Sequence, residues 1–216
     1  MLKNIEKPVP EKIKLPDGNN LDIVDDFKYL GAYIADSYSD FRRRKGIAWR
    51  KFWQLSKIWR ATNIPLKLKL QLFDSLILSI LFYAAQTWTV SKKMEKEVNS
   101  FGTSCYRIML NIKRTDRVRN TDILERVKKT NLCNVLYQRQ LRALGHWIRR
   151  ADSIVRTYAL YKNSSGHNRR GRPRLTYRRR MEQLTEMTCD EMKDLAMDRN
   201  GWKLVVRRFD TPPPER

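Results

Sequence analysis

The sequence predicts a mainly α-helical fold: a short N-terminal β-hairpin, then a helical bundle, then a basic C-terminal helical segment. Three observations support this prediction. Proline is absent between Pro16 and Pro65, apolar residues beyond residue 39 recur with helical spacing, and 41% of the 216 residues are hydrophobic. This composition is typical of a folded chain, and the length allows one or two small domains.

The first 35 residues carry the signals of strands and turns. Three prolines and the turn sequence DGNN precede the apolar stretches LDIV and FKYLGAYI. We expect these two stretches to pair as the hairpin. Asp25 and Asp26, which lie between them, could suggest a metal site, but no other carboxylate-bearing strand precedes them. We interpret them as turn or strand-end residues.

A first helix is predicted over residues 39–61. Its apolar positions fall on one face and form a core stripe: Phe41, Ala48, Phe52, Leu55 and Trp59. The opposite face is basic, with residues that recur every seven positions and three more at its start: Arg43, Arg50 and Lys57, then Arg42, Arg44 and Lys45. Either plain solvation or contact with phosphates explains this basic face.

A second helix is predicted over residues 65–88, with Pro65 at its first position. The stretch is apolar on nearly all sides, so we expect it to be the buried centre of the bundle. Its uncharged part, Ser75 to Val90, is 16 residues long. That length is short for a membrane crossing, so a buried helix is favoured.

Three more helices are predicted around the basic connector KRTDRVRN. One covers residues 92–111, with Cys105 as a small core residue, and a short one is capped by Thr121-Asp122 and ends near Lys129. The helix over 135–150 has two distinct faces. Its apolar stripe consists of Tyr137, Leu141, Leu144 and Ile148, and its basic stripe of Arg139, Arg142, His146 and Arg149.

Residues 163–175 are predicted to be a polar, basic loop because NSSGHNRRGRPR has no core face. Seven arginines between Arg169 and Arg180 favour a segment that lies along phosphates over a passive linker. Those within the loop are Arg169, Arg170, Arg172 and Arg174. A last helix over 176–197 is expected to turn Met181, Leu184, Met187 and Met192 inward. The predicted segments are therefore 1–35, 36–112, 113–162, 163–175 and 176–216.

The charge of the chain favours a polyanionic partner. Forty-five Lys and Arg against 23 Asp and Glu give a net charge of +22. Such a charge repels itself unless a polyanion neutralises it, so RNA or DNA is the expected partner, and a solvated surface is the alternative. The three cysteines are widely spaced and odd in number, and the sequence does not open on a secretory signal. We therefore expect an intracellular protein of the nucleus or cytoplasm.

Hydrolytic, metal and nucleotide-loop chemistry is poorly supported. The histidines, His146 and His167, have no Ser, Cys or Asp at a spacing that suggests a triad, and no Gly-rich phosphate loop occurs. A zinc set of Cys133, His146, His167 and Cys189 lacks any pair with the short gap of a zinc finger. We therefore predict no catalytic residue, no metal and no cofactor.

Several stretches, in this order, resemble the carboxy-terminal part of a non-long-terminal-repeat (LINE-type) retrotransposon reverse transcriptase. They are LDIVDDFKYLGAYI, FRRRKGIAWRKFWQLSKIWR, KLQLFDSLILSILFYAAQTWTV, LRALGHWIRR, NRRGRPRLTY and DRNGWKLVV. The first is similar to the primer-grip strand pair after the catalytic palm, the next two to the thumb helices, and the others to the segment after the thumb. The resemblance implies a thumb-like helical bundle over residues 36–112.

The resemblance also implies roles for residues. Tyr29, Leu30 and Gly31 would steady a primer terminus, the basic face of the first helix would contact the phosphates of a template–primer duplex, and the arginine-rich loop would clamp RNA or target DNA. The family's aromatic-Ala-Asp-Asp catalytic strand does not occur in the sequence. The expected function is therefore non-catalytic binding of RNA or an RNA–DNA duplex through the backbone, mainly by shape.

Other functions stay open at this point. The chain could be part of an active RNA-directed DNA polymerase whose palm and endonuclease lie on upstream sequence or on a separate palm-bearing chain, with Mg²⁺ only in that completed enzyme. It could be a partner-docking or membrane protein that uses the helix around Ser75 to Val90, although we expect no membrane contact. It could also be a non-functional transposon-derived reading frame.

Overall fold

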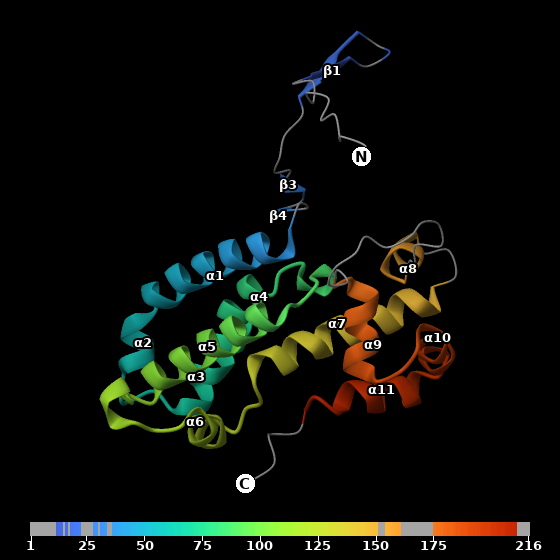
Figure 1. Cartoon of the computed structure of the whole chain (residues 1–216). Helices are drawn as coiled ribbons and strands as arrows, with labels where there is room; N and C mark the ends of the chain where they lie inside the picture. Colours follow the sequence, from blue (N-terminus) through green and yellow to red (C-terminus); the bar gives the residue numbers. More distant parts are fainter. Residues whose placement is uncertain are drawn as a thin grey trace, which may run out of the picture.

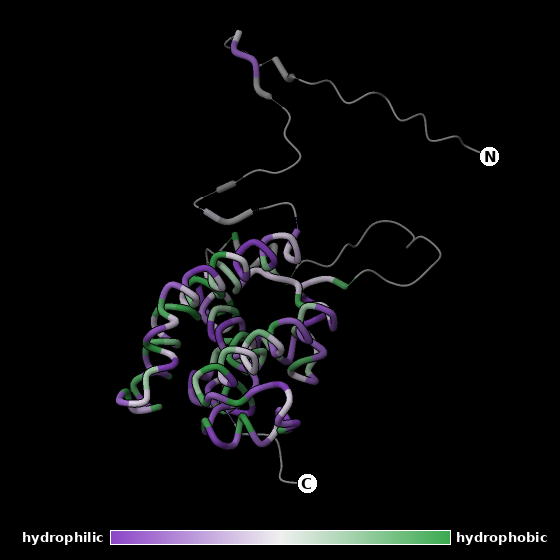
Figure 2. Tube along the Cα trace, turned by 90° about the vertical axis from the view of Figure 1, so that its left-hand side faces the viewer, coloured by the Kyte–Doolittle hydropathy of each residue, from purple (hydrophilic) through white to green (hydrophobic). Residues whose placement is uncertain are grey.

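The structure is a computed structural model, and it describes residues 12–14, 16, 18–22, 28–29, 31–33, 36–150, 154–160 and 175–210. The prediction of a mainly helical chain is confirmed over these residues (Figure 1). Hydrophilic and hydrophobic residues alternate along the helices (Figure 2). In a helix, such alternation at helical spacing gives one apolar and one polar side.

The expected pairing of LDIV with FKYLGAYI is not supported. The described strands form two separate antiparallel pairs of two or three residues: β1 (Lys12–Lys14) with β2 (Asn20–Asp22), and β3 (Lys28–Tyr29) with β4 (Ala32–Tyr33). Each pair has its own turn with a glycine at positive φ, Gly18 in the first and Gly31 in the second, both at 84°. Glycine tolerates this conformation, so the turn at Gly18 pairs the start of LDIV with residues 12–14 that precede it, and the turn at Gly31 folds FKYLGAYI back on itself.

The predicted first helix is broken into α1 (Ser37–Gln54) and α2 (Ser56–Arg60). Asp36 caps α1 by accepting a hydrogen bond from the Ser39 backbone N–H at 2.9 Å. The break occurs at Leu55, whose φ and ψ of −97° and 17° leave the helical region. The predicted core stripe is confirmed except at Leu55, which is only partly buried.

The predicted second helix is also interrupted, and it is not buried on all sides. It consists of α3 (Leu66–Leu72), a π-helical turn η1 (Phe73–Ile77), α4 (Leu78–Leu81) and a 3₁₀ turn η2 (Ala85–Thr87). Leu68, Leu76 and Tyr83 are 44%, 37% and 46% exposed. No helix within the described residues has both the length and the apolarity that a membrane crossing requires.

The third predicted helix is confirmed as α5 (Lys92–Met109), with Val98, Phe101 and Cys105 in the core. A 3₁₀ turn, η3 (Arg114–Asp116), and α6 (Asn120–Val127) follow. The expected capping of α6 by Thr121-Asp122 is not found, because α6 already begins at Asn120, with Arg119 at the N-cap and no side-chain cap. Burial raises the pKa of the Cys105 thiol, as expected for a cysteine that packs as a small apolar residue.

The long helix α7 (Leu132–Arg149) runs from the helices α1 to α6 to the C-terminal helices (Figure 1). It contributes to two apolar clusters. Its first half packs in a cluster with α1 to α6, where Leu136 and Tyr137 are buried. Its second half packs with the C-terminal helices, where Leu141, Leu144 and Ile148 are buried. The predicted apolar stripe of this helix is therefore confirmed, and its opposite side remains available to solvent.

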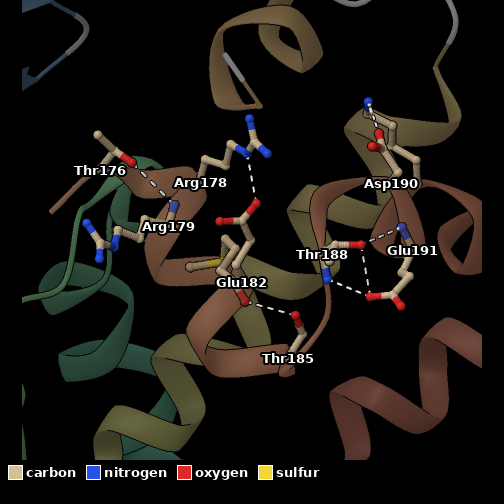
Figure 3. A network of polar contacts seen from close by, with 10 residues as sticks. Thr176, Arg178, Arg179, Glu182, Thr185, Thr188, Asp190 and Glu191 are labelled. Carbon is tan, nitrogen blue, oxygen red and sulfur yellow. Dashed lines mark hydrogen bonds and ion pairs between the residues drawn. The ribbon is translucent and has the colours of Figure 1, made fainter. Parts of the chain in front are cut away.

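The C-terminal part contains α8 (Ile154–Ala159), α9 (Tyr177–Thr185), α10 (Cys189–Met197) and α11 (Arg199–Arg207). The expected single helix over 176–197 is two helices because Thr188 and Glu191 form a capping box that starts α10 (Figure 3). Glu186 ends α9 in the left-handed conformation at φ 59°. Of the residues expected to point inward, Met181 and Met192 are buried, and Leu184 and Met187 are partly buried.

Candidate nucleic-acid interface

The polar side of α7 carries the basic stripe that the sequence predicts. Arg142 and His146 are exposed, and Arg149 is partly buried. Arg139 is also partly buried, with its guanidinium 5.3 Å from the centre of the Phe82 ring. Burial, followed by the neighbouring charge of Arg142, lowers the pKa of Arg139. All four predicted residues thus reach solvent at least in part along one side of α7, and Arg139 also lies against Phe82 of the bundle.

A second wall of basic residues comes from α11. Arg199, Lys203 and Arg207 follow one another at intervals of four residues, so they lie on one side of that helix, and all three are exposed. Two adjoining hollows, of about 420 and 460 Å³, lie between this side of α11 and α7, and Arg149 and Arg199 line both. We call this surface the basic groove; its basic residues are Arg142, His146, Arg149, Arg150, Arg199, Lys203 and Arg207.

Close contact between Gly145 and Trp202 positions the two walls. Trp202 is 3% exposed, and its indole N–H donates to the Leu141 carbonyl of α7 at 2.8 Å. A Cβ atom on Gly145 would lie 2.2 Å from the Trp202 Nε1 atom, closer than any side chain tolerates. The absence of a side chain at position 145 therefore lets α11 lie against α7 at this depth.

Arg149 links the groove to a third helix. Its Nη1 atom donates to the Ala196 carbonyl at 2.9 Å, in the last turn of α10. A guanidinium at this end satisfies a carbonyl that the helix itself leaves open and complements the helix dipole. Arg149 is thereby held in place, and its charge contributes to both hollows of the groove.

The electrostatics of the groove favour an anionic ligand with several charges. Six Lys or Arg side chains line the two hollows, and Asp210 is the one carboxylate among the lining residues. Cations crowded in this way repel one another, and a chain of phosphates relieves the repulsion. Within the described residues, no group of three or more His, Cys, Asp or Glu is arranged to hold a metal ion.

The basic face of α1 and α2 is only partly as expected. Arg42, Arg43, Arg50 and Lys57 are exposed. Arg44 is not turned to solvent: its side chain is 12% exposed, its Nε lies 3.8 Å from the Asp40 carboxylate, and its guanidinium lies 4.3 Å from the centre of the Tyr83 ring. Lys45 forms an ion pair with Glu97, which also accepts a hydrogen bond from Tyr38.

These internal partners correct the expectation that Arg44 and Lys45 belong to the solvent-facing set. The Lys45 and Tyr38 hydrogen bonds lower the pKa of Glu97, so this carboxylate is held in its charged form. Arg44 thus pairs with the buried Asp40 within α1, whereas Lys45 and Glu97, whose side chains are 26% and 27% exposed, form a partly exposed pair between α1 and α5.

The primer-grip-like residues are only partly described. Leu30 and the side chain of Tyr29 lie outside the described residues. The Gly31 carbonyl accepts a hydrogen bond from Arg44, and a Cβ atom on Gly31 would lie 3.7 Å from Arg44 Nη2 and 3.9 Å from Tyr83. Arg44 therefore ties the β3–β4 turn to α1, which is a positioning role and not a contact with solvent.

The arginine-rich loop, with Arg169, Arg170, Arg172 and Arg174, lies outside the described residues. Two arginines that follow it are engaged within the fold. Arg180 is 11% exposed and pairs with Glu95 at 3.2 Å, and Arg178 pairs with Glu182 at 2.9 Å (Figure 3). These two residues therefore stabilise α9 and its packing, and they are not part of the basic groove.

Sequence reasoning missed the α11 wall. The signal was present as Arg199, Lys203 and Arg207 at a spacing of four, a pattern that places residues on one side of a helix. No helix is predicted for this stretch from the sequence, so these three residues could not be assigned to one side of a helix. The position of α11 against α7 depends on the contact between Gly145 and Trp202, which are 57 residues apart in the sequence.

Comparisons with known proteins give one line of similarity. The chain is 28% identical, over 205 residues, to the transposon-derived protein F52C9.6 of Caenorhabditis elegans. The match covers 88% of this chain and 73% of that protein. No protein-family model matches the chain, and no solved structure matches it. The similarity therefore extends along most of the chain.

Proposed function

We propose that this chain is a non-catalytic nucleic-acid-binding module that holds the phosphate backbone of RNA or DNA in the basic groove between α7 and α11. One observation carries the proposal: the basic stripe of α7 and the basic side of α11 line the same two hollows, with a single carboxylate among the lining residues. A backbone ligand suits such a site because phosphate contacts need charge and position but no base-specific donors.

We further propose that the module derives from the thumb and carboxy-terminal region of a retrotransposon reverse transcriptase. The order of the six resembling stretches supports this origin, as does the similarity to a transposon-derived protein. In that setting the groove and the exposed Arg43, Arg50 and Lys57 would hold template, primer or target strands. The arginine-rich loop would add further phosphate contacts.

Neutralising the basic groove is expected to weaken duplex binding and its salt dependence. The variant Arg142→Gln/Arg199→Gln/Lys203→Gln removes three exposed charges from both walls. Because each phosphate contact contributes about 0.9 to the slope of log affinity against log salt, the slope should fall by about 2.7. Fluorescence anisotropy with a labelled RNA–DNA duplex between 50 and 200 mM salt measures it.

A matched control separates the groove from net charge. Arg114→Gln/Arg126→Gln/Lys128→Gln removes the same formal charge from exposed residues of the α6 region, away from both walls. Its salt slope should stay near that of the parent chain. Equal losses in the two variants would mean that the groove has no special role. Affinity that does not change with salt would exclude the electrostatic mechanism altogether.

The purified chain is expected to add no nucleotide to a primer. Its residues include no aromatic-Ala-Asp-Asp stretch, and two-metal catalysis needs carboxylates that hold two cations close together. A primer-extension assay with Mg²⁺ and all four deoxynucleotides, at protein concentrations that saturate the duplex, tests this expectation. Incorporation above that of a heat-denatured sample would show that the chain is a polymerase subunit in its own right.

A further inference from the structure

One aromatic side chain is exposed within a basic surface distant in sequence from the groove. Of the six tryptophans of the chain, Trp59, Trp88 and Trp202 are buried and Trp49 and Trp147 are partly buried, whereas Trp53 is 47% exposed. Its exposed π-face is therefore available for a flat ligand to stack on.

The surroundings of Trp53 are cationic. Arg50 precedes it by three residues on α1, so it lies about one helical turn from the ring, and it is exposed. Lys57, also exposed, lies in α2 just beyond the break at Leu55. The guanidinium carbon of Arg60, also exposed, lies 5.8 Å from the centre of the Trp53 ring. The sequence contains no Asp or Glu between Asp40 and Asp74, so no carboxylate of this segment opposes an anionic ligand.

The ring is also held in place from beneath. Trp49 stacks on Trp53 with ring centres 6.2 Å apart and planes 18° apart, and Trp49 in turn packs edge-on against Phe101 of α5 at 4.8 Å. A ring supported in this way loses little conformational entropy when a flat group stacks on it. A rigid aromatic surface between cations is the arrangement that single-stranded nucleic acids use, because every base offers a π-face and every linkage a phosphate.

We propose that Trp53 and Arg60 form a stacking site for an unpaired base of single-stranded RNA or DNA, with Arg50 and Lys57 holding the adjacent phosphates. This inference deepens the proposed function, since it assigns base contact to a surface separate from the basic groove. It implies that the chain binds a strand with bases more tightly than the same backbone without them.

The test compares two labelled single strands of equal length, a 12-nucleotide oligothymidylate and its abasic counterpart, by anisotropy with the full chain. From the usual contribution of one stacked base, Trp53→Ala should weaken oligothymidylate binding about 5- to 100-fold and leave abasic binding unchanged. Trp53→Tyr should retain most of the affinity. Leu68→Ala, at a residue of similar exposure (44%), should change the affinity for neither the oligothymidylate nor the abasic strand.

A spectroscopic readout guards against a folding artefact. Oligothymidylate should quench part of the tryptophan fluorescence of the parent chain, and the abasic strand should not. In Trp53→Tyr this quenching should disappear although the affinity is retained. Equal losses for both strands in Trp53→Ala, or no loss for either, would overturn the stacking site alone. Failure of the parent chain to bind either strand at low salt would overturn the proposed function as well.

Discussion

Replacement of Asp40 by Ala is expected to lower the free energy of unfolding by about 3–5 kcal/mol, since it breaks a buried ion pair from one side. Asp40 lies in the first turn of α1 and is 1% exposed. Its carboxylate accepts a hydrogen bond from the Trp88 indole N–H at 3.0 Å and lies 3.8 Å from Arg44 Nε. The substitution would leave the guanidinium of Arg44 without this counter-charge and the indole N–H without its acceptor.

The measurement is urea unfolding followed by circular dichroism, with two comparison variants. Asp40→Asn keeps the shape and one acceptor, so it should cost less than Asp40→Ala. Asp190→Ala removes a carboxylate whose side chain is 85% exposed and whose pair with Lys193 spans 2.8 Å. Surface pairs of that kind contribute at most about 1 kcal/mol. If Asp40→Ala cost no more than Asp190→Ala, the buried contact network would have no role in stability.

The Asp40 network also shows what the sequence could and could not predict. Asp40 and Arg44 are four residues apart on one helix, so their contact follows from helical geometry. The partner of Lys45 is Glu97, 52 residues away, and no local pattern indicates it. The runs of basic residues therefore correctly predicted an exposed basic face at Arg43, Arg50 and Lys57. They wrongly placed Arg44 and Lys45, which are partly buried, on that exposed face.

Helix existence was easier to predict than helix ends. The apolar periodicity of α5 and α7 depends only on local sequence, and both helices lie close to the predicted ranges. The break at Leu55 and the left-handed Ala84 have no Gly or Pro to mark them. The TCDE sequence of residues 188–191, by contrast, is a recognisable capping box that should have divided the last predicted helix.

The basic groove itself could not be derived from local patterns because it requires α11 to lie against α7. Arg142 and Arg149 were predicted from the α7 stripe, but their position opposite Arg199 and Lys203 depends on the fit of Trp202 over Gly145. A glycine inside a helix usually costs stability, so its presence in the middle of α7 was an indication of close helix packing.

Replacement of Trp202 by Ala is accordingly expected to cost about 3–5 kcal/mol and to weaken polyanion binding in the groove. The side chain is 3% exposed, and its removal leaves a hollow between α7 and α11 and deletes the hydrogen bond to the Leu141 carbonyl. Thermal unfolding gives the stability, and duplex anisotropy at low temperature, where the variant remains folded, gives the binding. Leu204→Ala, on the same helix at 63% exposure, should change both the stability and the duplex affinity only slightly.

A double-mutant cycle determines whether this contact sets the geometry of the groove. Gly145→Ala alone should destabilise the chain by about 1–3 kcal/mol, because its Cβ would overlap the Trp202 indole at 2.2 Å. In the Trp202→Ala background the same methyl group enters the vacated space, so Gly145→Ala should be close to neutral there. Strongly non-additive effects of this sign are expected for two residues in direct contact. Additive effects would mean that the two helices are held at this distance by other contacts, and the arrangement of the groove would then not depend on Gly145.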